Sequence, residues 1–88
     1  MTEHAVFFLS DGTGITAQAV GQSLLAQFEK INFATETIPY IDSEEKAHKV
    51  VNRINEVFNL KKIKPILFAT FAKDSIRNII ANSHGELF

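Results

Sequence analysis

The feature that most constrains this sequence is an apolar run that leads through a glycine loop into a helical pattern. The run from Ala5 to Leu9 (AVFFL) contains no polar residue, and the loop from Ser10 to Thr16 reads SDGTGIT. Continuous apolar strands are typical of parallel sheets that are buried on both faces. A strand that turns through glycines into a helix therefore indicates an α/β domain.

The loop has the composition of an anion site. Its glycines allow a tight turn that brings backbone N–H groups together, and the helix start adds unpaired N–H donors and the positive end of a dipole. Phosphates bind at such places. We therefore predict phosphate binding by the backbone N–H groups from Gly12 to Thr16, with Asp11 as the candidate catalytic group that orients a hydroxyl or assists a metal ion. The predicted phosphate-binding residues are Ser10, Gly12, Thr13, Gly14 and Thr16.

Two further strand–helix units follow. We expect helices over 17–28 and 73–82, a helix between them with an apolar stripe from Ala47 to Phe58, and strands over 33–40 and 65–70. The middle helix has the clearest apolar stripe and is expected to start at a capping box of Asp42 and Glu45. The inward residues expected on the first helix are Ala17, Val20, Gly21, Leu24 and Phe28, and those on the third are Ile76, Ile79 and Ile80. Gly85 is expected to end the third helix with a positive φ.

This β-α-β-α-β-α pattern predicts a three-layer α/β fold with a parallel three-stranded sheet. The first and third strands are wholly apolar, whereas polar residues from Thr35 to Thr37 and Pro39 suit an edge strand. The strand order 2-1-3 follows, which is flavodoxin-like or Rossmann-like. It puts the first and second helices on opposite faces and the loop at a topological switch point. With 88 residues, the whole chain is expected to be one domain.

Charge and composition exclude several classes of function. Nine basic and ten acidic residues give a net charge of −1, which argues against a nucleic-acid footprint or a polybasic membrane patch. The chain has no cysteine, which excludes disulfides and thiolate chemistry. Its three scattered histidines predict neither a catalytic triad nor a metal site. No apolar run suits a signal peptide or a membrane span, so we expect a cytoplasmic protein.

Taken alone, the loop is compatible with several binding functions. Residues 12–17 fit the dinucleotide pattern G-x-G-x-x-A, for which Glu36 or Asp42 would be the acid that binds the ribose. Residues 13–16 resemble the T-G-x-T loop of flavodoxins, with only Tyr40 and Phe71 near enough to stack on a flavin. A plain turn is the third possibility. No Gly-Lys pair is present, which excludes a Walker A loop. A stand-alone module that binds phosphate, a nucleotide or a flavin therefore stays open.

The loop in its setting resembles a known family. Residues 7–17 (FFLSDGTGITA) look like the opening of the phosphoenolpyruvate synthase regulatory proteins, which are relatives of the pyruvate, phosphate dikinase regulatory proteins. The likeness continues through residues 27–28, 37–40 and 76–80, and so covers essentially the whole chain. Ile15 stands where the dikinase branch tends to carry tryptophan, which favours the synthase branch.

The resemblance implies a bifunctional regulatory serine/threonine kinase and pyrophosphorylase. Such proteins use ADP to phosphorylate a threonine of the target enzyme, which inactivates it, and reverse this with phosphate to yield pyrophosphate. The implied partner is phosphoenolpyruvate synthase or pyruvate, phosphate dikinase. The family's nucleotide P-loop lies in a later segment, so the chain resembles only the N-terminal domain. ADP and phosphate are implied for the longer family proteins, and we expect this chain alone to hold no cofactor and to lack kinase activity.

The third strand also suggests self-association. Residues 66–69 are apolar enough for a central strand, and no further strand is predicted after Thr70 to cover them. An open apolar edge tends to pair with another copy, and Leu87 and Phe88 add apolar surface. We therefore predict a homo-oligomer.

Overall fold

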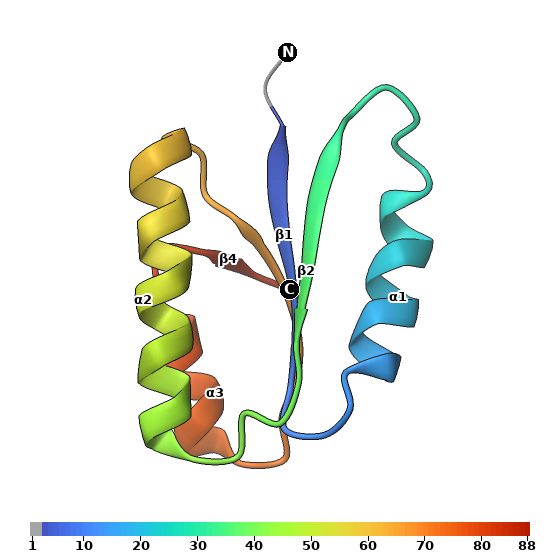
Figure 1. Cartoon of the computed structure of the whole chain (residues 1–88). Coiled ribbons are helices and arrows are strands. Elements are labelled where there is room, and N and C mark those ends of the chain that lie inside the picture. The colour runs from blue at the N-terminus through green and yellow to red at the C-terminus, as the bar shows by residue number, and fades with distance from the viewer. Residues whose placement is uncertain (1–2) are drawn as a thin grey trace.

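In the computed structural model, which describes residues 3–88, alternating strands and helices build three layers, with α1 alone on one face of the sheet and α2 and α3 on the other (Figure 1). The elements are β1 (His4–Ser10), α1 (Ile15–Leu25), β2 (Phe33–Ile38), α2 (Glu44–Lys61), β3 (Ile66–Thr70), α3 (Asp74–Ala81) and β4 (Glu86–Leu87). The predicted α/β class and the opposite placement of the first two helices are confirmed.

The sheet is parallel, with the order β2-β1-β3-β4. The predicted order 2-1-3 is confirmed, but the prediction of three strands is wrong. The fourth strand, β4, pairs with β3 through Ile66 and Leu67, and the Phe88 N–H donates to the Leu67 carbonyl at 2.9 Å. This strand covers part of the β3 edge, so the argument that the edge lies open also needs correction. The sequence did not predict β4, because a strand of two residues is too short to show the apolar pattern by which strands are recognised.

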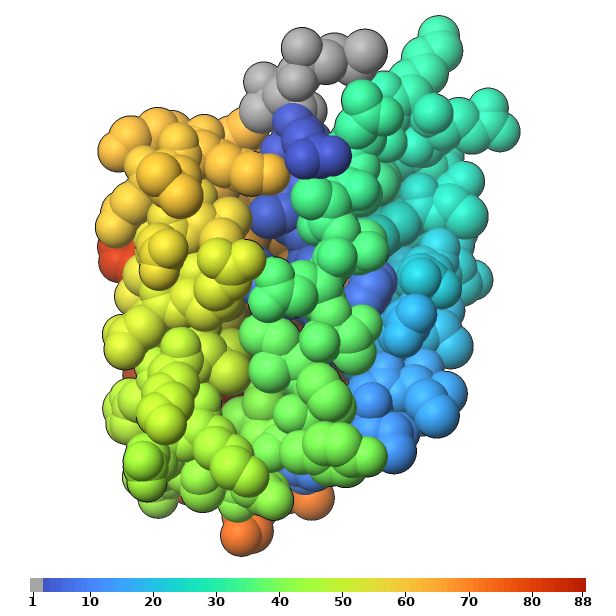
Figure 2. All heavy atoms as spheres, in the orientation of Figure 1, coloured from blue at the N-terminus to red at the C-terminus, as the bar shows by residue number. Residues whose placement is uncertain are grey.

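The polar residues of β2 predicted an edge strand, and this strand does form one edge of the sheet. Figure 2 shows its side chains on the molecular surface, between α2 and α1. The strand ends at Ile38, one residue before Pro39, which has no N–H to continue the ladder. The central strand β1 is instead buried from Val6 to Ser10.

Alternation along β1 and β3 divides the core into two parts. Phe7, Leu9 and Leu67 face α2 and α3, where they pack with the stripe of α2 and with the buried isoleucines of α3. Val6, Phe8 and Phe68 face α1 in a smaller cluster. The predicted inward residues of α3 and the apolar stripe of α2 are buried or half-buried, as their spacing indicates. The stripe consists of Ala47, Val50, Val51, Ile54, Val57 and Phe58.

The first helix ends at Leu25 rather than at Phe28, and its predicted inward face is wrong in three positions. Ala17 and Gly21 are buried, but the exposed fractions are 53% for Val20, 45% for Leu24 and 53% for Phe28. A β carbon on Gly21 would collide with the Phe8 and Phe68 rings. The helix therefore approaches the sheet along its two small residues, and the larger apolar side chains on either side of that contact remain exposed.

Two predicted caps also differ. Ser43, rather than Asp42, caps α2, and its hydroxyl accepts from the Lys46 N–H at 3.2 Å. Gly85 does not adopt a positive φ. Its β carbon would lie 2.6 Å from a methyl group of Leu67, so glycine is needed there for the close approach of β4 to β3.

Candidate functional site

The loop from Ser10 to Thr16 lies at the carboxyl end of β1, beside the connections from β2 to α2 and from β3 to α3 (Figure 1). It is joined to the first of these connections by two backbone hydrogen bonds. The Tyr40 N–H donates to the Gly12 carbonyl at 2.8 Å, and the Ile41 N–H donates to the Ser10 carbonyl at 2.9 Å. Because three parallel strands end at this edge, the fold brings these segments together at the predicted switch point.

The Ser10 side chain holds the start of the loop. Its hydroxyl oxygen is 3.0 Å from the Gly12 nitrogen, which donates to it, and 3.0 Å from the Thr70 hydroxyl. Ser10 is only 4% exposed. The Gly12 N–H, predicted to bind phosphate, is therefore engaged inside the loop. Thr70 was not singled out in the sequence, although the order 2-1-3 places the end of β3 beside Ser10, where the two residues are register partners.

The helix start offers backbone donors. Gly14 precedes α1 with φ of 85°, and no side chain caps the helix there. The Thr13 hydroxyl accepts from the Ile15 N–H at 3.4 Å, a long bond. Within residues 3–88, the N–H groups of Thr13, Gly14, Thr16 and Ala17 have no hydrogen-bond partner. An uncapped helix start of this kind has the donors and the dipole that an anion requires.

Asp11 connects the loop to the segment after β3. Its Oδ2 atom accepts from the Ala72 N–H at 2.9 Å, and its own N–H donates to the Thr70 carbonyl at 3.4 Å. Asp11 thus has a structural contact at the same edge as the unpartnered N–H groups. The Oδ2 atom of Asp11 is occupied by this contact, and its Oδ1 atom accepts no hydrogen bond from the described residues.

A second carboxylate at this edge is paired with a lysine. The Lys46 Nζ atom lies 2.8 Å from Asp42 Oδ1 and 3.5 Å from the Tyr40 carbonyl oxygen. The hydrogen bond and charge of Lys46 lower the pKa of Asp42, and the charge of Lys73 acts in the same direction. Asp42 therefore stays ionised at neutral pH. Its ion pair with Lys46 is lost only as the pH falls through the lowered pKa of Asp42.

The structure weighs against two of the binding functions considered for the loop. The candidate ribose-binding acids are both in ion pairs, Asp42 as above and Glu36 with Arg53 at 3.0 Å. Of the two aromatic residues near enough to stack on a flavin, Phe71 is buried in the core, which leaves only Tyr40 exposed. Among residues 3–88 there is no cluster of three or more potential metal ligands. No described helix has both the length and the apolar character needed to cross a bilayer.

Comparison with known proteins gives one consistent family. The sequence model of the kinase/pyrophosphorylase family matches residues 6–87. A relative from Marinobacter nauticus is 49% identical over 83 residues, which are 94% of this chain and 31% of the relative. One from Hahella chejuensis is 53% identical over 85 residues, which are 97% of this chain and 31% of the relative. Both are provisionally named phosphoenolpyruvate synthase regulatory proteins. The chain thus spans slightly less than a third of the length of the curated relatives it matches.

Proposed function

Because the chain belongs to the kinase/pyrophosphorylase family, we propose that it is the phosphate-binding part of a regulatory kinase and pyrophosphorylase that acts on phosphoenolpyruvate synthase. The names of the relatives support this choice of target. In the proposed cycle, ADP is the phosphoryl donor for a threonine of the synthase, and inorganic phosphate removes that phosphoryl group as pyrophosphate. Both directions require a site for a phosphate group.

The observation that carries the proposal is the uncapped start of α1. A phosphate bound there would accept hydrogen bonds from the N–H groups of Gly14, Thr16 and Ala17, with the Thr13 and Thr16 hydroxyls beside them. The bonds around Ser10 and the two connections hold this backbone in place before the anion arrives. Such preorganisation lowers the cost of binding, because the loop has little conformational freedom to lose.

We assign Asp11 to orienting the hydroxyl or metal ion that approaches this phosphate, and its charge should weaken the binding of phosphate by itself. Asp11→Asn keeps an oxygen for the Ala72 N–H but removes the charge, and we expect phosphate to bind more tightly, by up to roughly five-fold, because like charges repel by ~1 kcal/mol in water when they approach to about 4 Å. Asp11→Ala also removes the contact with Ala72. We expect it to lower the free energy of unfolding by about 1–2 kcal/mol. Phosphate titration and urea denaturation of both variants test this assignment, and weaker phosphate binding by Asp11→Asn would contradict it.

The regulatory role is tested with a chimera. The Marinobacter nauticus relative is rebuilt with this chain in place of its matched region, and phosphoenolpyruvate synthase is incubated with ADP and either the chimera or the 88-residue chain. We expect threonine phosphorylation by the chimera, measured by mass spectrometry, and none by the chain alone, which has no Gly-Lys-Ser/Thr loop to hold a β-phosphate.

Two results would contradict this proposal. Phosphate transfer by the 88-residue chain would mean that the nucleotide site lies within it. A chimera that folds but does not phosphorylate the synthase, under conditions where the intact relative does, would show that this chain does not perform the role of the matched region.

A further inference from the structure

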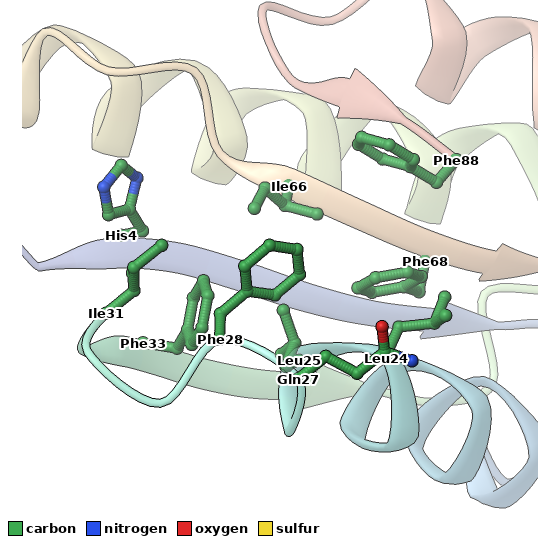
Figure 3. A pocket seen from close by; sticks show the side chains of 10 residues that line it. All are labelled: His4, Leu24, Leu25, Gln27, Phe28, Ile31, Phe33, Ile66, Phe68 and Phe88. Carbon is green, nitrogen blue, oxygen red and sulfur yellow. The ribbon is translucent and has the colours of Figure 1, made fainter.

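An apolar groove runs along the side of α1 that faces β3. Two adjoining cavities of about 470 and 180 Å³ share Leu24, Phe68 and Phe88 and together form this groove. Figure 3 shows the larger cavity, into which Leu24 and Phe28 from α1 and its following turn, Ile66 and Phe68 from β3, and Phe88 beyond β4 all project. We call this surface the α1 groove.

The groove exists because the two faces of the sheet are covered unequally. Two helices cover one face, whereas α1 alone covers the other. Because α1 meets the sheet at Ala17 and Gly21, its larger apolar residues stand at the wall of the groove. The exposed fractions of Leu24, Phe28 and Phe88 are 45%, 53% and 70%. Contiguous apolar surface of this kind marks a place where another surface packs.

We propose that the α1 groove is the docking site of an amphipathic helix, supplied in longer family members by the polypeptide outside the region that this chain matches. The smaller cavity reaches Thr70 at the carboxyl end of β3, and the larger reaches Ile66 at its start. The five residues of β3 span about 17 Å, which equals roughly three turns of helix. Helices dock into such grooves through apolar side chains on one face.

The relatives are long enough to supply this helix from polypeptide outside the matched region. The matched region makes up 31% of the Marinobacter nauticus and Hahella chejuensis proteins, so most of each polypeptide lies outside it. The Phe88 ring centroid lies 5.9 Å from that of Phe68 in the floor of the groove. Polypeptide that continues past this position therefore begins at the rim of the groove.

A small-molecule ligand fits the groove less well. Of the residues lining the larger cavity, only His4 and Gln27 have polar side chains, and His4 lies against the Phe33 ring. Ligand sites usually combine apolar walls with several convergent polar groups. A second copy of this chain is the remaining alternative, and the experiment below separates it from the helix.

The test compares how fast a cysteine in the groove reacts in the chain and in the chimera described above. The 88-residue chain has no cysteine, so Leu24→Cys introduces a single thiol there. Leu60→Cys is the matched control, because Leu60 is 77% exposed on α2, on the opposite face of the sheet. A maleimide reagent labels each protein, and peptide mapping identifies the labelled residue. We expect the Leu24→Cys thiol to react at least ten-fold more slowly in the chimera, and the Leu60→Cys thiol to react equally fast in both proteins.

Two other outcomes overturn the proposal. Equal rates for Leu24→Cys in both proteins would mean that no segment covers the groove. Labelling of Leu24→Cys that slows as the concentration of the 88-residue chain rises, with no further protection in the chimera, would assign the groove to a second copy. If the chimera does not fold, the same rates are measured in the intact Marinobacter nauticus protein with cysteines at the aligned positions. The readout is independent of kinase activity, so it distinguishes failure of this inference from failure of the proposed function.

Discussion

Replacing Gly21 with alanine will lower the free energy of unfolding by about 2–3 kcal/mol, although alanine is normally favoured over glycine in a helix by ~1 kcal/mol. The added β carbon would lie 2.8 Å from Cδ2 of Phe68 and closer still to the Phe8 ring. Phe8, the ring that the added β carbon approaches most closely, is 1% exposed, so this ring has no space into which to withdraw. Either α1 moves away from the sheet or the rings leave their preferred rotamers. Urea denaturation measures the loss.

The matched control for Gly21 is the neighbouring residue on the same helix. Gln22 is exposed, and Gln22→Ala should change the free energy of unfolding by no more than ~0.5 kcal/mol. If Gly21→Ala instead stabilised the protein, as its helix propensity alone predicts, the close approach of α1 to the sheet would be wrong.

Replacing Gly14 with alanine will lower the free energy of unfolding by about 2 kcal/mol and abolish phosphate binding. Gly14 has φ of 85°, a conformation that costs L-residues ~1–2 kcal/mol, and an added β carbon would lie 2.9 Å from Cγ2 of Thr37. Relief of the backbone strain at this positive φ requires the loop to move, and the N–H groups that start α1 would move with it. Urea denaturation and phosphate titration give the two readouts.

Gly12→Ala is the matched control, because it places the same methyl group in the same loop without the same strain. The φ of Gly12 is not positive, and the nearest atom to an added β carbon is Ser10 Oγ at 3.8 Å. We expect a change of at most ~1 kcal/mol and retained phosphate binding. Equal losses in both variants would show that Gly14 has no special conformational role.

The parts of this fold that could be predicted are those in which one physical requirement dominates the composition. Burial on two faces leaves no place for polar residues between Val6 and Leu9 of β1, whereas the exposed edge strand accepts Thr35 and Glu36. This contrast was enough to obtain the order of the first three strands. The long stripe of α2 was recognisable for the same reason. The position of the glycine loop followed directly from the strand and the helix beside it.

The other features of the fold and the site depend on contacts that produce no periodic pattern of apolar residues in the sequence. β4 is two residues long and is specified by the space that Gly85 leaves beside Leu67. Ala17 and Gly21 were correctly placed on the inward face of α1, but the apolar spacing does not reveal that a contact at these two small residues leaves the larger apolar residues of this segment exposed. In the site, the pairing of Asp11 with Ala72 and of Ser10 with Thr70 joins residues about 60 positions apart in the chain, and only the register of β1 and β3 brings them together.

Titration of the 88-residue chain with inorganic phosphate, followed by amide chemical shifts, tests the central claim most directly. We predict saturable shifts at millimolar phosphate that are largest for Gly14, Thr16 and Ala17, with much smaller shifts for exposed amides on α2 such as that of Leu60, and no such response in Gly14→Ala. If the amides at the start of α1 stay in place while others shift, or if nothing saturates, the phosphate site does not lie in this loop and the proposed function loses its basis in this chain.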